Sequence, residues 1–242
     1  MKLKSILKSL VPSVGRNNES CRERWLKNKL LEIPANSKIL DAGAGTQRFR
    51  KYCERLEYVS QDFGEYDGKG DGVALHTKEF DYGKLDIISD IISIPKPDSS
   101  FDAIMCIEVL EHLPDPVSAI NEFGRLLKPN GYLIITAPFC SLTHFAPYHF
   151  SSGFNKYWYE KHLSEYNFRN VEIGSNGNFF EYIAQEIYRV PSISSRYSDS
   201  KPNLLELFSM FIVQRMLLRF SKKDAGSSEL LCYGYHVCAR KI

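Results

Sequence analysis

Short apolar runs alternate with amphipathic runs along most of this chain. The strand-like runs are Lys38–Asp41, Tyr58–Asp62, Leu85–Asp90, Phe101–Ile107 and Tyr132–Pro138. Segments with helical periodicity are Glu19–Leu31, Thr46–Leu56 and Pro116–Leu127. Buried strands that alternate with helices are typical of a parallel sheet with right-handed crossovers. The pattern therefore predicts an α/β fold with helices on both faces of the sheet.

The C-terminal part of the chain departs from this alternation. Two more strands are predicted at Asn170–Ile173 and Leu230–Lys241, with helices at Phe179–Arg189 and Leu204–Phe220 between them. The final run alternates in side-chain character, as a strand with one buried face does. Pro191–Asn203 is rich in serine and proline and resembles a linker. We therefore expect a helical insertion before the last strand.

These patterns predict an N-terminal segment at residues 1–17 and one domain at residues 18–242. The domain divides into a cofactor half at 36–138, acceptor and cap elements at 139–229, and the last strand at 230–241. In the N-terminal segment, apolar residues at helical spacing are separated by lysines: Leu3, Ile6, Leu7 and Leu10. Such a basic amphipathic segment either forms a terminal helix or makes a weak peripheral membrane contact.

The segment Leu204–Phe220 is the most apolar of the chain. It carries three charged residues and is shorter than the roughly 20 apolar residues that span a bilayer. We expect a helix with a wide buried face, and contact with a partner or a membrane surface is the alternative.

Composition and charge narrow the class of protein. The 242 residues carry a formal net charge of +2 without a dense lysine or arginine block, so nucleic acid is not an expected partner. The six cysteines form no CxxC pair and show no zinc-ligand spacing. We therefore expect reduced thiols, a cytoplasmic location and no bound metal.

Acidic residues end or follow most of the predicted parallel strands: Asp41, Asp62, Asp90 and Glu108. In an open α/β sheet the ligand crevice lies outside the carboxyl ends of the strands. One such residue is explained as a helix cap, but four at successive strands predict a carboxylate-lined rim.

A Gly-x-Gly turn, Gly43 and Gly45, follows the first strand in the segment KILDAGAGTQRF. The third glycine of a dinucleotide fingerprint is missing, and a pyrophosphate would not favour the Asp41 carboxylate beside it. S-adenosylmethionine carries an ammonium and a sulfonium, which carboxylates attract. Asp62 stands 21 residues after Asp41, where a carboxylate binds both hydroxyls of a ribose. The loop therefore favours S-adenosylmethionine over a nicotinamide dinucleotide.

Five motifs occur in a fixed order: Asp41–Gly45, Asp62, Asp90–Ile91, SFDAIMCIEVLEHLPDP (Ser100–Pro116) and RLLKPNGYLIITAP (Arg125–Pro138). Together they closely resemble the class I S-adenosylmethionine-dependent methyltransferases, in the type 11 branch that includes quinone-biosynthesis methyltransferases. The resemblance implies an enzyme with a Rossmann-like, seven-stranded, mostly parallel sheet whose last strand is antiparallel.

The resemblance also implies the cofactor-binding residues. Asp41, Gly43 and Gly45 would lie beside the amino-acid end of the cofactor, and Asp62 would bind the ribose hydroxyls. The other implied contacts are Phe63, Asp90 and Ile91 at the adenine and the backbone of Cys106 and Ile107 near the methionyl ammonium. Two positions depart from the family pattern, Gln47 in the glycine loop and Asn130 in a common Pro-Gly-Gly turn.

The acceptor is expected to lie over the same rim, near residues Pro138–Leu163, which are rich in histidine and aromatic rings. His149, His144 and His112 are candidate general bases because imidazole titrates near physiological pH. Candidate substrate-binding residues are Tyr148, Tyr157 and Trp158. A helix at Ser152–Tyr166 would bury Trp158, so this ring and the histidines have structural alternatives. The arrangement THFAPYHF resembles an uncharacterised bacterial subgroup of the same methyltransferases.

We therefore expect methyl transfer to a small metabolite or to a surface-glycan or lipid precursor, by in-line displacement at an oxygen, with a histidine base. A catalytically silent, cofactor-binding partner subunit of the same fold is the alternative. A nicotinamide-dependent oxidoreductase fits less well, because it calls for the missing loop glycine. The identity of the acceptor and the oligomeric state stay open.

Overall fold

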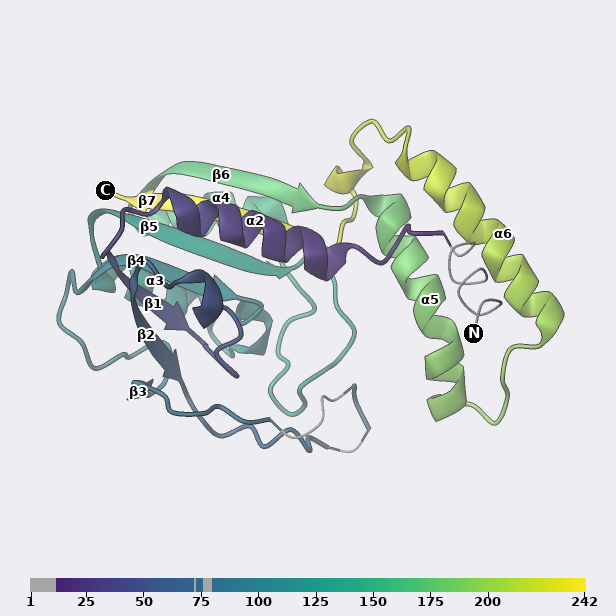
Figure 1. The fold of residues 1–242 in the computed structure, drawn as a ribbon, viewed down its shortest axis with the longest axis horizontal. Coiled ribbons are helices and arrows are strands. Elements are labelled where there is room, and N and C mark those ends of the chain that lie inside the picture. Colours follow the sequence, from purple (N-terminus) through teal and green to yellow (C-terminus); the bar gives the residue numbers. More distant parts are fainter. Residues whose placement is uncertain (1–11, 72, 76–79) are drawn as a thin grey trace. The chain divides into compact units, whose positions relative to one another are not determined.

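The computed structural model describes residues 12–71, 73–75 and 80–242 of the chain. Its central feature is a seven-stranded sheet with the strand order β3-β2-β1-β4-β5-β7-β6 (Figure 1). The strands are β1 (Lys38–Ala42), β2 (Glu57–Asp62), β3 (Ile87–Ile88), β4 (Phe101–Ile107), β5 (Leu127–Pro138), β6 (Phe168–Asn176) and β7 (Gly234–Lys241). Strands β1 to β5 pair in parallel, and β7 is antiparallel to β5. The α/β sheet predicted from the sequence is confirmed.

The described α-helices lie between and before the strands. They are α2 (Asn18–Glu32), α3 (Pro116–Leu126), α4 (Lys156–Glu165), α5 (Phe179–Tyr197) and α6 (Leu204–Ser221). Three short 3₁₀ helices complete this part of the chain: η1 (Arg50–Tyr52), η2 (Leu110–His112) and η3 (Ser227–Glu229). Helices α5 and α6 follow β6 and precede β7, so the expected helical insertion before the last strand is present.

Two compact units make up the chain. The larger one contains residues 22–174 and 234–242, and therefore most of the sheet. The smaller one contains the described residues 12–21 and 175–233, and its core joins Val14, Ala184 and Leu217. The predicted limits 1–17 and 18–242 stay a prediction. Leu3, Ile6, Leu7 and Leu10 of the expected amphipathic segment lie outside the described residues.

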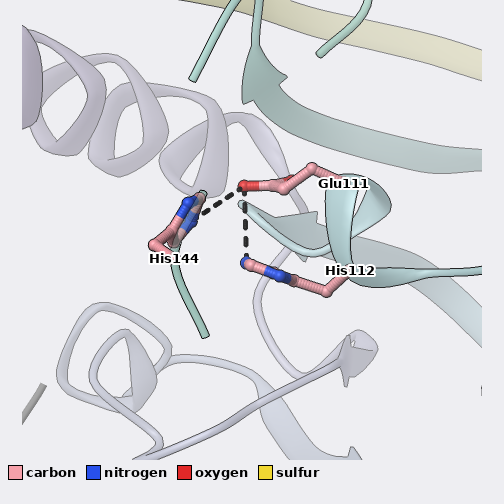
Figure 2. Close-up of side chains that lie close together, drawn as sticks. All are labelled: Glu111, His112 and His144. Carbon is pink, nitrogen blue, oxygen red and sulfur yellow. Dashed lines mark ion pairs between the residues drawn. The ribbon is translucent and has the colours of Figure 1, made fainter. Parts of the chain in front are cut away.

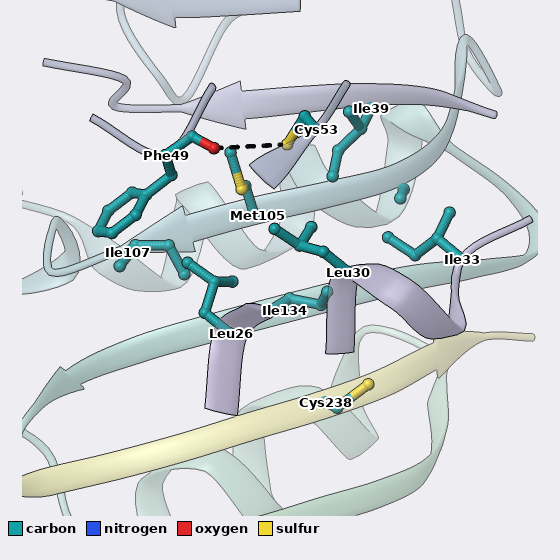
Figure 3. Packing of buried hydrophobic residues seen from close by; sticks show 11 residues of the cluster. Leu26, Leu30, Ile33, Ile39, Phe49, Cys53, Met105, Ile107, Ile134 and Cys238 are labelled. Carbon is teal, nitrogen blue, oxygen red and sulfur yellow. Dashed lines mark hydrogen bonds between the residues drawn. The ribbon is translucent and has the colours of Figure 1, made fainter. Parts of the chain in front are cut away.

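The core of the larger unit forms because α2 lays an apolar side on one face of the sheet (Figure 3). Leu26 and Leu30 of α2 pack with Ile39 of β1 and Met105 of β4, and all four side chains are buried. On this face β1 and β4 are bound in register, with Ile39 opposite Ala103. Helices α3 and α4 contact β5 and β7, respectively. Because β1 to β5 run in parallel, their carboxyl ends lie at one edge of the sheet.

The segment Thr46–Leu56 is not the α-helix that its periodicity predicted. It forms turns and the short η1, and Gln47 has a left-handed backbone with φ of 54°. The Gln47 amide donates hydrogen bonds to the carbonyls of Tyr82 and Lys84, at 2.8 and 2.9 Å. These long-range bonds hold a conformation that helical residues do not adopt, so tertiary contacts override the local pattern.

Helix α6 does not have the wide buried face that was expected: among its residues only Gln214 and Leu217 are buried, and Leu204, Leu205 and Phe208 are more than half exposed.

Three further expectations need correction. Helix α5 continues through Pro191 to Tyr197, so half of the supposed linker is helical. Strand β3 has only two residues, because it is the edge of the sheet and pairs only with β2. In α4, Tyr159 takes the buried position expected of Trp158, whose side chain is only half-buried.

Helix α3 begins with an N-cap that makes a testable prediction. The Asp115 carboxylate accepts hydrogen bonds from the Ser118 backbone N–H at 3.0 Å and from its hydroxyl at 2.6 Å. Asp115→Ala should lower the free energy of unfolding by about 1 kcal/mol, as loss of an N-cap does. Urea denaturation measures this change, and Asp115→Asn should restore most of it because the amide oxygen still accepts. Equal loss in both variants would contradict the capping role.

The Ser118 bonds also lower the pKa of Asp115. Its contribution to stability is therefore present above the ordinary aspartate pKa and is lost as the pH falls through the lowered value.

Among the helices that the structure describes, none combines the length and the apolarity needed to cross a bilayer.

Candidate active site

A cavity of about 950 Å³ opens at the carboxyl ends of β1, β2 and β4, within the larger unit. This volume is in the range of small-molecule and cofactor sites. Most of the residues predicted from the sequence line it: Asp41, Gly43, Gly45, Asp62, Phe63, Asp90, Ile91, Ile107, His112, His144 and Tyr148. The carboxylates that are scattered along the sequence thus meet at one site, as the acidic rim predicted.

Four predicted residues are not among the described residues that line the cavity. Cys106 is fully buried in β4, next to the lining residue Ile107. His149 stands behind His144, with ring centroids 4.9 Å apart. Tyr157 is 63% exposed on α4, and Trp158 of the same helix packs on Phe154. The substrate-binding role of the last two stays a prediction that the cavity does not support.

The glycine loop after β1 uses its own backbone donors. The Gly43 and Ala44 N–H groups donate to the Gln61 carbonyl at 2.9 and 2.8 Å, and the Gly45 N–H donates to the Asp62 carboxylate at 2.8 Å. A pyrophosphate site needs such N–H groups to point at the ligand. Because they are bound within the protein here, and no α-helix follows, the loop is unsuited to a dinucleotide.

Asp41 is the most deeply buried carboxylate of the loop, with 1% exposure. Burial raises its pKa to about 7, although the Tyr58 hydroxyl donates to its carboxylate at 2.6 Å and opposes the rise. The charge of Asp62 raises it further. A buried carboxylate of this kind gains most from a cationic ligand, which restores its ionised form.

Asp62 and Asp90 lie at the ends of neighbouring elements. Asp62 is buried at the end of β2, where burial raises its pKa and the backbone N–H groups of Gly45 and Gly64 oppose this. Asp90 is exposed just after β3 and accepts from the Ile92 N–H at 3.1 Å. Both carboxylates keep lone pairs that hydroxyl or amino groups of a ligand can use.

The pKa of Asp41 makes affinity for a cationic ligand pH-dependent. Such a ligand favours ionised Asp41, so affinity for S-adenosylhomocysteine, which carries an ammonium, should rise about tenfold between pH 6 and pH 8. Isothermal titration at several pH values measures this change. Asp41→Asn should flatten the profile, and Tyr58→Phe should move its midpoint to higher pH because the carboxylate loses a donor.

The raised pKa of Asp41 also makes the stability of the ligand-free protein depend on pH, but stability falls where ligand affinity rises. The folded pKa of Asp41 lies above the ordinary value of 3.8, so the ligand-free protein should lose stability as the pH rises from about 4 to 7. A wild-type affinity profile that is flat, or that falls with pH, would contradict the assignment of Asp41 to the ligand.

Arg22 of α2 was not singled out from the sequence, but it lines the cavity. Its guanidinium pairs with Glu108 at 2.9 Å, and Glu108 also accepts from the Thr136 hydroxyl at 2.8 Å. The lining contains six acidic residues against two arginines, so the site attracts cations overall. An arginine on an amphipathic helix carries no sequence signal for such a position.

An aromatic cover over the glycine loop was also missed. Phe80 lies 3.1 Å from the position of a Cβ at Gly45, and it contacts Tyr66 and Phe145 edge-on. Phe63 contacts Tyr148 in the same manner, with centroids 4.9 Å apart. Phe63 and Tyr148 were predicted, but Tyr66, Phe80 and Phe145 were not. Phe145 comes from a segment more than sixty residues after Tyr66 and Phe80, so no local pattern indicated that these three rings meet.

His112 and His144 face the buried Glu111 on one wall of the cavity (Figure 2). Their Nε2 atoms lie 3.7 and 3.9 Å from Glu111 Oε1. Burial lowers the pKa of His112 to about 3, and the nearby His144 adds to this effect. Burial also lowers the pKa of His149, whose Nε2 lies 3.2 Å from the Ser141 hydroxyl. The three imidazoles therefore form one cluster, of which two members reach the cavity.

Comparison with known proteins identifies a methyltransferase domain over residues 40–135. An uncharacterised methyltransferase of Schizosaccharomyces pombe is 31% identical over 127 residues, which cover 49% of this chain and 44% of that protein. A ubiquinone biosynthesis O-methyltransferase of Xanthomonas axonopodis pv. citri is 32% identical over 109 residues, 43% of this chain and 44% of that protein. The chain thus spans less than half the length of these relatives.

Solved structures share the fold over most of the chain. A SAM-dependent methyltransferase from Archaeoglobus fulgidus aligns over 90% of this chain and 94% of its own, with a TM-score of 0.52 and 18% identity. The [4+2]-cyclase SpnF aligns over 90% and 81%, with the same score and identity. At this identity the likeness shows the fold alone. Residues 40–135 therefore form a methyltransferase domain, carried by strands β1 to β5, and the chain has the Rossmann-like fold of S-adenosylmethionine-dependent methyltransferases.

Proposed function

We propose that this chain transfers a methyl group from S-adenosylmethionine to a hydroxyl oxygen of a small metabolite or of a surface-glycan or lipid precursor. The observation that carries the proposal is the convergence of Asp41, Asp62 and Asp90 on one cavity, within the matched methyltransferase domain. S-adenosylmethionine carries an ammonium and a sulfonium, which a wall of carboxylates attracts. The N–H groups of the glycine loop are already bound within the protein, so they do not favour an anionic ligand instead.

The cavity suggests how the donor is oriented. Asp62 binds the ribose hydroxyls, and Asp90 with Ile91 lies at the adenine, on which Phe63 packs. Asp41 lies at the methionyl ammonium. The Arg22 guanidinium, which also pairs with Glu108, is a lining cation that can meet the methionyl carboxylate.

The acceptor lies against the aromatic cover and the histidine cluster. Rings with polar tips suit flat apolar faces and sugar rings, and Tyr148 offers such a ring beside Phe63. His144 is the base that we favour, because it lines the cavity while His149 does not. Its Nδ1 lies 2.8 Å from the Leu142 carbonyl and therefore carries the proton, which leaves the Nε2 lone pair to accept one from a hydroxyl.

Alignment of donor and acceptor supplies most of the rate in such a displacement. Holding two reactants in line contributes about 7–11 kcal/mol, and a general base adds a factor of about 10² to 10⁴. The protein need not supply a nucleophile of its own, because the sulfonium already activates the methyl group.

Two measurements test the proposal in sequence. Isothermal titration with S-adenosylmethionine and S-adenosylhomocysteine should show saturable binding of one molecule per chain. A radiolabelled methyl donor is then screened against phenols, nucleotide sugars and lipid precursors. The absence of heat with either ligand would overturn the proposal. Binding without transfer to any of these acceptors would instead support the cofactor-binding subunit.

A further inference from the structure

The wall formed by Glu111, His112 and His144 presents three lone pairs to one point (Figure 2). His112 Nδ1 lies 2.5 Å from the Tyr148 carbonyl, and His144 Nδ1 lies 2.8 Å from the Leu142 carbonyl. A carbonyl only accepts, so each ring carries its proton on Nδ1 and its lone pair on Nε2. Both Nε2 atoms face Glu111 Oε1, which is also an acceptor when ionised.

The second oxygen of Glu111 strengthens this observation. Glu111 is 1% exposed, and the described residues offer no hydrogen bond to its Oε2 atom. A buried carboxylate oxygen without a donor costs free energy unless a cation lies nearby. Glu108 is not part of the group, because Arg22 and Thr136 already bind both of its oxygens.

We propose that Glu111, His112 and His144 bind one divalent transition-metal ion in this wall of the cavity. The ligand atoms lie within 4.8 Å of one another, and tetrahedral zinc would bring neighbouring ligands to about 3.4 Å. The two Nε2–Oε1 distances of 3.7 and 3.9 Å then shorten by a few tenths of an ångström, and rotation of the imidazoles brings the two Nε2 atoms together by up to about 1.4 Å. Each imidazole already donates its other N–H to a carbonyl, which is the usual support for a metal-bound histidine.

The donor set also indicates which metal binds. Two imidazoles and one carboxylate suit zinc, cobalt, nickel or ferrous iron, whereas magnesium and calcium prefer oxygen ligands alone. Three protein ligands leave coordination positions on the side of the cavity. Backbone hydrogen bonds also hold the ligand segments together. The Phe150 and Ser151 N–H groups donate to the Glu111 carbonyl, which ties the segment after His144 to η2.

Binding of the ion does not depend on methyl transfer; only its use rests on the proposed function. An acceptor hydroxyl in the cavity could occupy an open position, and the metal would lower its pKa. The hydroxyl would then release its proton to solvent water before the methyl transfer, so His144 would act as a ligand instead of a base.

The test is a direct titration of the full chain after treatment with a chelator and without S-adenosylmethionine. Calorimetry with Zn²⁺ and visible absorption with Co²⁺ should show one ion per chain. His112→Ala and His144→Ala should each weaken binding by at least about 10- to 100-fold. Magnesium should not compete. Matched controls are His149→Ala, which removes the neighbouring imidazole outside the cavity lining, and His162→Ala on α4 next to Glu165; both should bind as the wild type does.

A variant that keeps the shape of the site guards against misfolding. Glu111→Gln retains the side-chain volume and removes the charge, so it should stay folded and lose the ion. Zn²⁺ should raise the thermal midpoint of the wild type and not that of Glu111→Gln. The proposal is overturned if the wild type does not saturate, if Glu111→Gln and His144→Ala bind like the wild type, or if His149→Ala loses binding equally.

A separate titration of the metal-free chain with S-adenosylhomocysteine tests the proposed function. Cofactor binding without metal binding refutes the metal site alone, and metal binding without cofactor binding refutes the methyltransferase proposal alone.

Discussion

Gly43→Ala is expected to lower the free energy of unfolding by about 2–5 kcal/mol and to remove measurable cofactor binding. Gly43 has a φ of 75°, and a left-handed backbone costs an alanine about 1–2 kcal/mol. A Cβ there would also lie 2.6 and 2.7 Å from the two methyl groups of Val109, and such overpacking costs about 1–3 kcal/mol more. Relief of this contact moves the glycine loop after β1 away from Val109, which follows β4, and the donor is proposed to lie on this loop.

Urea denaturation and titration with S-adenosylhomocysteine measure the two effects of Gly43→Ala. Combining it with Val109→Ala should recover the part of the stability that is due to overlap, but not the part due to φ. Gly226→Ala is the matched control, because Gly226 also has a positive φ, 111°, with no atom within 4 Å of its Cβ position. If Gly43→Ala were no more destabilising than Gly226→Ala, the close approach of Val109 would not constrain the loop.

Asp62→Ala is expected to weaken the binding of S-adenosylmethionine by about 10- to 150-fold. This corresponds to about 1.5–3 kcal/mol, the value of hydrogen bonds to a charged group. The carboxylate binds the Gly45 N–H at 2.8 Å and the Gly64 N–H at 3.2 Å, so it also positions the loops on either side of the ligand. Calorimetric titration measures the dissociation constant.

Two further variants separate ligand contact from loop structure at Asp62. Asp62→Asn keeps one oxygen acceptor and should fall between the wild type and Asp62→Ala. Asp98→Ala removes an exposed carboxylate that pairs with Arg125 outside the cavity lining, and it should leave affinity unchanged. An unchanged dissociation constant in Asp62→Ala would remove this residue from the cofactor site.

Much of the fold could be predicted because its strands are continuous apolar runs. Phe101–Ile107 was predicted to the residue as β4, and α3 ends one residue from its expected limit. Runs of this kind are buried on both faces of a sheet wherever they pair, so their secondary structure depends little on context. The acidic residues that follow them share one edge for the same topological reason, which is why Asp41, Asp62 and Asp90 meet as expected.

Predictions failed where distant contacts decide the local backbone. Thr46–Leu56 has helical periodicity, yet the bonds of Gln47 to the segment at residues 82–84 hold it in turns. Tyr157 and Trp158 are aromatic residues in a suitable stretch of sequence, but the start of α4 directs them away from the cavity. In both cases the residue types could be interpreted from the sequence, but the direction in which the side chains point could not.

The sequence by itself determined the parallel sheet, the glycine turn and the methyltransferase domain at residues 40–135, because hydrophobic periodicity and backbone freedom are properties of neighbouring residues. Only the tertiary structure decided that Glu111 and His112 of η2 face His144, more than thirty residues later, with both Nε2 lone pairs directed at one carboxylate. Arg22 and the aromatic cover reached the cavity in the same way. Side-chain convergence of this kind depends on loop paths and on buried carbonyl partners, neither of which leaves a periodic pattern in the chain.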